Sequence, residues 1–570
     1  MYADLALVNG KIYSVSGDDK VRRGSCVLVK GDRIFKVCEG DEEQKYIGKA
    51  TRVIDCKGHT ILPGLCDAHC HPSWSTSFFE SCQLFDVTGT QENTSRQVID
   101  MYLEKLRGFI KSHENAEIIR AIGWNRAFFS GACKESRWPS RHDIDRVCSD
   151  RPVVMESYCQ HAIWINTRAI EMAGLDKNTP DVASGEIFRE EDGYPSGIFF
   201  EMEAQSLIKN NLKNYDYSVE QYKDTIKRFQ NEVALPLGIT LYNDCFHTEN
   251  ATEAYKELAQ EGELKLRVRG VHHFADCKDL SMVDDIEKKI GSCDVGDIFQ
   301  INTIKIFFEG EFMTMEPYEK KAIEEQNLPE GYCGAEFYDD ETAKKATAKA
   351  LGTGMQVHIH AMGDRAVKQA VDCLEYGQQI TGMKNRNVIA HLMMVRDEDI
   401  QRIGKNEIIC NCQPRWMIYD SDADEFYQEM FGHERTVKIY PNKQFLDAGC
   451  VVSYGTDFPV TPPPDPFHGI HCAVTRSVFK GDEKEYSRYK GAVLGPESNP
   501  RQDCVTLKDA VKSSTWSGAY QLFLEDVTGS IQEGKSAEIV VIDRDIENTP
   551  QEELYNTKVC HTIFKGKAVY

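Results

Sequence analysis

The sequence predicts an α/β protein whose largest domain is a (β/α)8 barrel, also called a TIM barrel. Eight short apolar runs follow one another along the chain, and segments with helical spacing follow several of them. A strand and a helix that alternate eight times form a closed parallel sheet. Several runs also end in side chains that can bind a metal, as expected at the catalytic face of such a barrel. The runs are 61–68, 238–244, 265–274, 301–308, 354–361, 387–394, 407–413 and 450–456.

The clearest helical segment follows the fifth run. Apolar residues between Val367 and Leu374 have the i, i+3, i+4, i+7 spacing of a helix with one buried face. We expect Asp364 to be the N-cap and Gly377 to lie beyond the C-terminal end of this helix.

The two ends of the chain have a different pattern from the middle. Residues 4–55 alternate short apolar runs with Asn-Gly and Gly-Asp turns, which predicts a meander of short antiparallel strands. The segment 521–570 has the same pattern. We therefore expect residues 1–60 and 521–570 to form one small β-sandwich module, with the barrel at 61–520 between them.

One connection is much longer than the others, since an insertion of about 75–235 follows the first barrel strand. A connection of this length has secondary structure of its own. In a barrel it leaves from the catalytic face, so it is a candidate lid or pocket wall. Candidates for the lining of a substrate pocket, with core packing as the alternative for the aromatic residues, are Trp124, Trp164, Gln413 and Trp416.

Composition argues for a small-molecule partner. The net charge of -23, from 90 acidic and 67 basic residues, opposes binding to nucleic acid or to an anionic membrane. No run approaches the roughly 20 apolar residues that cross a bilayer, and the first residues lack the pattern of a signal peptide. The 20 cysteines are scattered without a C-x-x-C pair, so we expect a cytoplasmic enzyme with reduced thiols rather than a disulfide framework.

The first barrel run ends in two histidines, His69 and His71. Alternate residues of a strand share a face, so both imidazoles are expected to point the same way, roughly 7 Å apart, and to reach one cation. Such a pair is common by chance among surface and packing histidines. The same placement recurs, however, because His360, His391 and Asp457 end three further runs. A histidine-rich set with a carboxylate favours zinc among the divalent ions.

Lys305 lies in the fourth run, 301–308, among mostly apolar residues. A lysine in such surroundings either extends its amine to solvent or loses its charge.

These motifs together resemble the amidohydrolase superfamily, and more narrowly its subgroup three of YtcJ-like and N-substituted formamide deformylase-like proteins. The likeness covers essentially the whole chain. The matching strings are PGLCDAHCH at 63–71, GWN at 123–125, HAIWIN at 161–166, HAMGDRA at 360–366, His391, Gln413-Pro414, GTDFPV at 455–460 and GSIQEGKSAE at 529–538.

The resemblance implies a homodimeric hydrolase with one or two divalent metals, in which Lys305 can be carboxylated and bridge two ions. The alternative is a plain lysine that pairs with an acid such as Glu309. The chain departs from the usual subgroup pattern at Thr456, at Glu309-Gly310 and at Glu538, which stand where serine, Asp-Gly and aspartate are usual. These departures put the identity of the substrate in doubt.

The function predicted from these residues is metal-assisted hydrolysis of a carbon–nitrogen bond in a non-peptide amide, N-acyl or formamide substrate. Asp457 is the expected general base and acid. His161, from the insertion, is a candidate hydrogen-bond donor to the oxyanion, with a purely structural histidine as the alternative. Two other functions stay open at this stage: a metal-dependent deaminase of an aminated heterocycle, and a non-catalytic scaffold that shares the fold.

Overall fold

The computed structural model describes residues 2–570 except 88, 90–91, 130–136, 160, 183–184, 311–312, 316, 326–327 and 335. The chain forms two compact units. One comprises Met1–Pro72 and Ile226–Tyr570, and the other comprises Ser73–Thr225.

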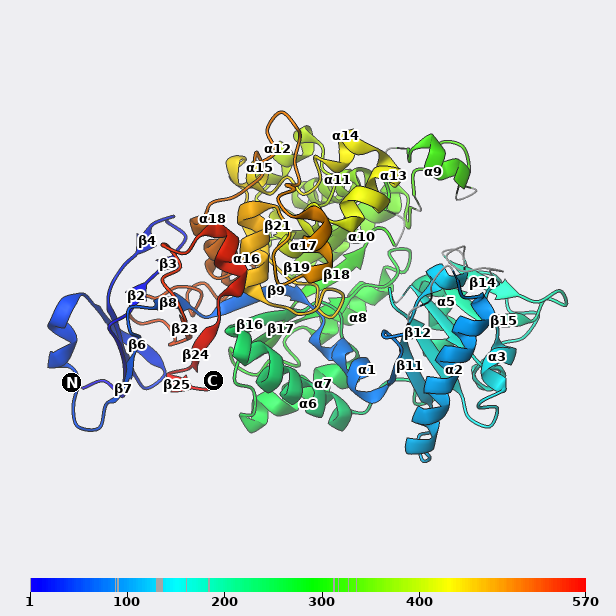
Figure 1. The fold of residues 1–570 in the computed structure, drawn as a ribbon, viewed down its shortest axis with the longest axis horizontal. Coiled ribbons are helices and arrows are strands. Elements are labelled where there is room, and N and C mark those ends of the chain that lie inside the picture. The colour runs from blue at the N-terminus through cyan, green and yellow to red at the C-terminus, as the bar shows by residue number, and fades with distance from the viewer. Residues whose placement is uncertain are drawn as a thin grey trace. The chain divides into compact units, whose positions relative to one another are not determined.

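The larger unit contains the predicted barrel (Figure 1). Eight parallel strands pair in chain order, so that each strand lies beside the next one along the sequence. The strands are β9 (Leu65–Cys70), β16 (Ile239–Asp244), β17 (Arg267–His273), β18 (Phe299–Phe307), β19 (Gln356–Ala361), β20 (Val388–His391), β21 (Ile409–Cys412) and β22 (Val452–Tyr454). After β22, the backbone N–H of Asp457 donates to the carbonyl of His69 over 2.8 Å. This bond joins the two edge strands and nearly closes the sheet.

Helices follow most of the barrel strands, as the alternating pattern predicts. They include α7 (Glu249–Glu261), α8 (Ser281–Lys289), α10 (Asp340–Gly352), α11 (Asp364–Thr381), α12 (Asp397–Lys405), α15 (Asn442–Asp447), α16 (Pro466–Thr475), α18 (Leu507–Ser513) and α19 (Trp516–Gln521).

The bounds predicted for α11 are wrong at both ends. Gly363 is the N-cap, Asp364 is the first helical residue, and Gly382 is the C-cap. Gly377 lies inside the helix, where a Cβ atom would come within 2.3 Å of Leu351 Cδ1 on α10. The glycine therefore permits close helix packing rather than ending the helix.

The first predicted barrel run, 61–68, divides into two strands of different sheets. Its beginning belongs to β8 (Thr60–Pro63), and β9 starts at Leu65. Gly64 lies at the crossing, where a Cβ atom would be 2.0 Å from Oγ1 of Thr240 on β16. Only glycine lets the backbone come this close, so Gly64 permits the chain to pass from one sheet to the other.

The two chain ends form a β-sandwich, as predicted. A four-stranded sheet has the order β6-β5-β1-β7, and a five-stranded sheet has the order β2-β8-β23-β24-β25. Apolar residues of both sheets, among them Leu7, Val29, Ile539 and Ile563, share one core. The strands not yet given are β1 (Leu5–Val8), β2 (Lys11–Ile12), β5 (Cys26–Lys30), β6 (Arg33–Cys38), β7 (Arg52–Asp55), β23 (Ile539–Ile542), β24 (Val559–Phe564) and β25 (Lys567–Ala568).

The prediction of a purely antiparallel meander at the N-terminus is wrong. Strand β1 pairs in parallel with β7, and β2 pairs in parallel with β8. The chain changes between the two sheets instead of turning back within one, so that strands far apart in sequence become neighbours.

The unit Ser73–Thr225 has a mixed six-stranded sheet of its own, in the order β10-β11-β12-β13-β15-β14. Its elements include β10 (Cys82–Gln83), α2 (Ser95–Ser112), β11 (Ile119–Trp124), β12 (Val153–Ser157), β13 (Ala162–Ile165), β14 (Glu186–Arg189), β15 (Pro195–Phe200) and α5 (Glu201–Lys209). Trp124 and Trp164 are 0% exposed and belong to its hydrophobic core. Their indole N–H groups donate to the carbonyls of Met155 and Ser140, each over 2.9 Å. The predicted pocket role of these two tryptophans is therefore wrong, because their rings pack inside the unit.

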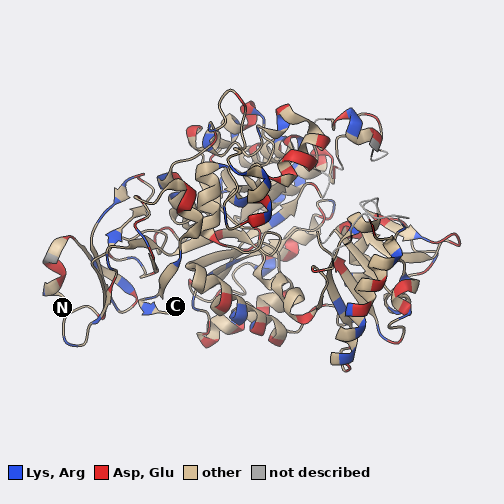
Figure 2. Cartoon of the chain, viewed as in Figure 1, with Lys and Arg blue, Asp and Glu red and all other residues tan. Residues whose placement is uncertain are grey.

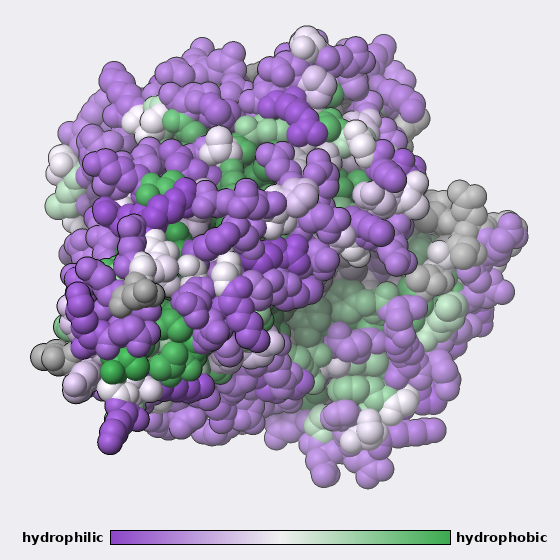
Figure 3. Space-filling view, turned by 60° about the vertical axis from the view of Figure 1, so that its left-hand side comes forward, coloured by the Kyte–Doolittle hydropathy of each residue, from purple (hydrophilic) through white to green (hydrophobic). Residues whose placement is uncertain are grey.

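Charged side chains of both signs occur on many elements (Figure 2), and most of the face drawn in Figure 3 is hydrophilic. Within the part of the chain that the structure describes, none of the helices is long and apolar enough to cross a membrane. The cysteines that the structure describes form no disulfide, and most of them are buried.

Replacement of Gly64 by alanine tests the crossing between sandwich and barrel. The added methyl group has to displace Thr240, a stiff β-branched residue that is 0% exposed. We expect Gly64→Ala to lower the free energy of unfolding by about 1–3 kcal/mol, measured by urea denaturation. Gly352→Ala is the matched control, because no atom lies within 4 Å of a Cβ there. Equal stability of the two variants would contradict the close approach at Gly64.

Candidate metal centre

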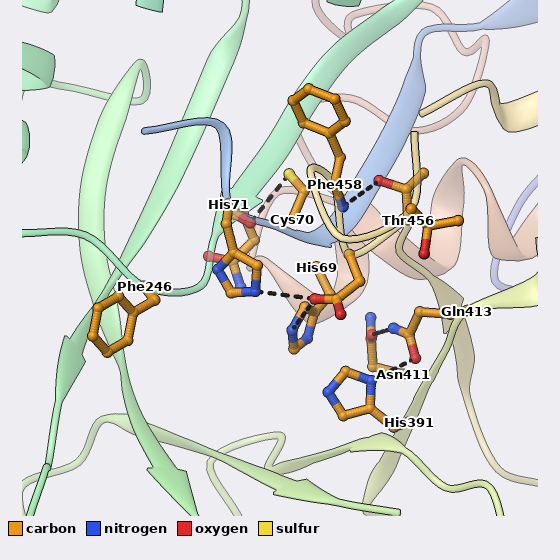
Figure 4. Close-up of polar contacts among 12 residues, drawn as sticks. His69, Cys70, His71, Phe246, His391, Asn411, Gln413, Thr456 and Phe458 are labelled. Carbon is orange, nitrogen blue, oxygen red and sulfur yellow. Dashed lines mark hydrogen bonds and ion pairs between the residues drawn. The ribbon is translucent and has the colours of Figure 1, made fainter. Parts of the chain in front are cut away.

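The carboxyl ends of four barrel strands bring the predicted metal ligands together. Strand β9 contains His69 and leads directly into His71, β19 contains His360, and β20 ends in His391. Asp457 follows β22. Figure 4 shows the side chains of His69, His71 and His391 at this end of the barrel.

The inner part of this group is compact and buried. Oδ1 of Asp457 lies 3.0 Å from Nε2 of His71 and 3.3 Å from Nε2 of His69. His69, His391 and Asp457 each offer one ligand atom, and these three atoms lie within 4.8 Å of one another. Such a spacing suits donors around one cation, to which each would bind at roughly 2.0–2.2 Å.

Two further predicted residues lie beside this group. The ring of His360 is half-buried and centred 4.4 Å from the ring of His391. Lys305, on β18, is 0% exposed. Its amine lies 4.9 Å from the ring centre of Phe307, which lies 5.1 Å from the ring centre of His360. The structure thus gathers all six predicted ligands at one end of the barrel, and their metal binding stays a prediction.

Burial gives these side chains the charge states of metal ligands. It lowers the pKa of His391 to about 4, and it holds the pKa values of His69 and His360 well below the usual range. Their imidazoles are therefore neutral near pH 7, with a lone pair available. Burial alone would raise the pKa of Asp457, but hydrogen bonds from His69 and His71 outweigh it and hold that pKa well below its usual value. Neutral imidazoles and an ionised carboxylate are the forms that bind a divalent cation.

Lys305 is a buried amine without a hydrogen-bond partner among the described residues. Burial lowers its pKa to about 8, so a substantial fraction of the amine is uncharged in mildly alkaline solution. The alternative pairing of Lys305 with Glu309 is wrong. The Glu309 carboxylate instead accepts hydrogen bonds from the backbone N–H groups of Thr314, Met362 and Gly363.

Gln413 supports His391 and does not line a pocket, which corrects the prediction. It is 0% exposed. Its Oε1 lies 2.8 Å from Nδ1 of His391, and its Nε2 donates to Oδ1 of Asn411 over 2.9 Å. Trp416 remains a candidate for the pocket, because it is half-buried and stacks on His391 with ring centres 5.5 Å apart. Its indole N–H donates to Oγ1 of Thr461 over 2.6 Å.

The role of Asp67 was missed by the sequence analysis. Its carboxylate accepts hydrogen bonds from the backbone N–H of Thr456 over 2.9 Å and from Oγ1 of Thr456 over 2.5 Å. Asp67 therefore ties β9 to the loop that positions Asp457. Its position two residues before His69, on the same face of the strand, is the signal that could have identified it.

A thiol near the site was also missed. Cys245 directly follows β16, and its Sγ lies within 4.8 Å of ligand nitrogens of His69 and His358. His358 lies on β19 two residues before His360, and its Nε2 is 3.0 Å from Nδ1 of His69. This contact leaves Nε2 of His69 directed toward Asp457.

His161 belongs to the other unit, Ser73–Thr225. Its Nδ1 lies 3.0 Å from Oε2 of Glu201, and its side chain is 32% exposed. The part of His161 in catalysis stays a prediction.

Comparisons with known proteins agree with this fold. A sequence profile described as the amidohydrolase family matches residues 52–570. The protein YtcJ of Bacillus subtilis (strain 168) is 26% identical over 550 residues, which span 93% of this chain and 92% of YtcJ. The N-substituted formamide deformylase of Arthrobacter pascens is 24% identical over 578 residues, which span 100% of this chain and 98% of the deformylase.

A solved structure has the same fold. An uncharacterized metal-dependent hydrolase from Pyrococcus horikoshii OT3 aligns with a TM-score of 0.71 at 24% sequence identity, covering 96% of this chain and 99% of that chain.

The hydroxyl of Thr456 offers a test of the link between β9 and the Asp457 loop. Thr456→Val keeps the side-chain shape but removes one donor to the buried Asp67 carboxylate. We expect a loss of about 1–3 kcal/mol in the free energy of unfolding, measured by urea denaturation of the metal-free protein. Thr456→Ser keeps the hydroxyl and should lose less than about 1 kcal/mol. A valine variant as stable as the serine variant would show that the hydroxyl does not secure this loop.

Proposed function

Because the chain belongs to the amidohydrolase family, we propose that it is a metal-dependent hydrolase that cleaves a carbon–nitrogen bond in a small non-peptide amide, N-acyl or formamide substrate. One observation carries the proposal: histidines from β9 and β20 and the carboxylate of Asp457 gather, buried, at the carboxyl end of the barrel. Catalytic residues of (β/α)8 barrels occur at this end.

The donor set fits a divalent metal ion. Five side chains would hold it, namely those of His69, His71, His360, His391 and Asp457. We propose zinc, because most of these donors are imidazole nitrogens and the remaining one is a carboxylate oxygen. When bound, such an ion supplies Lewis-acid activation of water and of a carbonyl group.

Asp457 has the chemistry of a proton carrier. Its carboxylate is ionised near neutral pH, since the hydrogen bonds from His69 and His71 hold its pKa well below the usual value. It can accept a proton at a carboxylate oxygen while water attacks the substrate carbonyl carbon. The same proton then passes from Asp457 to the nitrogen that leaves as an amine.

Lys305 is the proposed site of carboxylation. Its amine is buried beside the donor set and is partly uncharged near its pKa of about 8. The uncharged nitrogen can attack carbon dioxide, with formation of an N–C bond and release of one proton. The product is a carbamate, whose negative charge would allow the site to hold a second divalent ion.

The surroundings favour a substrate with an apolar substituent. Half-buried aromatic rings lie beside the donor set: Phe307 neighbours His360, and Phe246 lies 6.4 Å from Phe307 between ring centres. Trp416 stacks on His391. Apolar and aromatic linings with few polar groups are typical of small-molecule pockets. The relative from Arthrobacter pascens is named an N-substituted formamide deformylase, which makes N-substituted formamides the first substrates to assay.

Asp457→Asn tests the proton transfer. The amide has almost the shape of the carboxylate but cannot accept the proton, so we expect turnover to fall about 10²- to 10⁴-fold. The assay measures release of amine and acid from a series of formamides that differ only in the nitrogen substituent. Asp447→Asn is the control, because Asp447 is exposed on α15. Unchanged turnover in Asp457→Asn would remove Asp457 from the mechanism. Release of ammonia from an aminated heterocycle, with no carboxylic acid product, would indicate a deaminase.

Carboxylation of Lys305 is tested by labelling. Protein loaded with zinc in ¹³C-bicarbonate should show a carbamate carbon signal by NMR and bind about two ions per chain. Lys305→Arg should lose the signal and bind about one ion, because the guanidinium does not form the carbamate. A wild-type protein with no carbamate signal would overturn this part of the proposal.

A further inference from the structure

A chain of side-chain amides links His391 on β20 to the backbone of β9. His391 contacts Gln413, and Gln413 contacts Asn411, as Figure 4 shows. Asn411 in turn donates through Nδ2 to Oε1 of Gln521, over 3.1 Å. Gln521, the last residue of α19, donates through Nε2 to the carbonyl of Ala68 over 2.9 Å.

The chain of hydrogen bonds can run in only one direction. A backbone carbonyl only accepts, so the nitrogen of the Gln521 amide has to face Ala68 and its oxygen has to face Asn411. Asn411 must then present its NH2 group to Gln521 and its oxygen to Gln413. By the same reasoning Gln413 presents its NH2 group to Asn411 and its oxygen to His391. Among the described residues, the donor that meets this oxygen is an N–H at Nδ1 of His391.

From this geometry we propose that Asn411 and Gln521 are positioning residues that fix the tautomer of His391, so that Nδ1 carries the proton and Nε2 presents its lone pair to the metal centre. This chain of hydrogen bonds, the relay, begins at the carbonyl of Ala68, the residue before His69. It ends at His391 on β20. The proposal rests on the proposed function, because it assumes that His391 binds the metal through Nε2.

The relay is buried and secured on both sides. Asn411, Gln413 and Gln521 are each 0% exposed, so water does not compete for their hydrogen bonds. Ser453, on β22, donates through Oγ to Oε1 of Gln521 and also accepts from Nδ2 of Asn411 over 3.1 Å. These bonds satisfy the amide groups in the stated direction, and a reversed amide would place two donors or two acceptors face to face.

If the relay fixes the tautomer of His391, one variant should weaken metal binding and a second change should restore it. A role in packing alone would not give this restoration. If Asn411 is replaced by leucine, the Gln413 amide is free to rotate and can present its NH2 group to His391. Nδ1 then becomes the acceptor and Nε2 carries the proton, so His391 cannot bind the metal through Nε2. A carboxylate in place of the Gln413 amide can only accept, so it restores the original tautomer even when Asn411 is absent.

The experiment compares wild type, Asn411→Leu, Gln413→Glu and the double variant Asn411→Leu/Gln413→Glu. Zinc affinity is measured on metal-free protein by competition with a chromophoric chelator, and the melting temperature of each metal-free protein records its folding. We expect Asn411→Leu to bind zinc about 10- to 100-fold more weakly than wild type. The double variant should recover most of this loss while melting no higher than Asn411→Leu.

The outcomes separate the relay from the proposed function. A wild type that binds no zinc contradicts the proposed function itself. Where wild type binds zinc, the relay is overturned if Asn411→Leu binds equally well, or if the double variant folds but recovers no affinity. Should Asn411→Leu not fold, Gln521→Met with and without Gln413→Glu replaces the pair, and the same loss and recovery are expected.

Discussion

The hydrogen bonds between the first and last barrel strands are the constraint on which the site depends. The backbone N–H of Asp457 donates to the carbonyl of His69, and Asp67 accepts two hydrogen bonds from Thr456. These bonds bring the carboxylate of Asp457 against His71, which lies 386 residues earlier in the chain, and against His69. Asp457 has a φ of 60°, a left-handed conformation that aspartate tolerates better than most residues. The hydrogen bonds made by the Asp457 backbone and by Thr456 offset the strain of this conformation.

Burial then decides the chemistry of the gathered groups. Removal from water keeps the imidazoles of His69, His360 and His391 neutral, while hydrogen bonds keep Asp457 ionised. The same burial lowers the pKa of Lys305. A buried carboxylate is costly unless hydrogen bonds or a positive partner stabilise it, and in our proposal a divalent cation is the positive partner. The buried donor set therefore supports the proposal of a metal-dependent hydrolase.

Much of the fold could be predicted from the sequence. Strand periodicity identifies the barrel strands, and parallel strands of a closed barrel end at the same rim. These rules place His69, His71, His391 and Asp457 at one end of the barrel from the sequence alone. They did not show that the run 61–68 changes sheet at Gly64, because apolar residues in one continuous run give the same pattern whether they belong to one sheet or to two. Nor did they show that α11 continues through Gly377, where packing against Leu351 determines the residue.

The remaining errors concern side chains whose role depends on distant neighbours. Trp124 and Trp164 lie in the core of Ser73–Thr225, and Gln413 faces His391 rather than a substrate. Asp67 gained its role only because Thr456 lies beside it in space. A single sequence does not specify such partners, whereas it does specify which side chains end the strands.

The most direct test of a metal centre between the strand ends is the anomalous X-ray scattering of a crystal grown from zinc-loaded protein. We expect a strong peak within coordination distance, roughly 2.0–2.2 Å, of Nε2 of His391 and of the Asp457 carboxylate, with His69 and His71 completing the set. A map of the fully loaded protein with no peak between these residues would contradict the proposed metal centre.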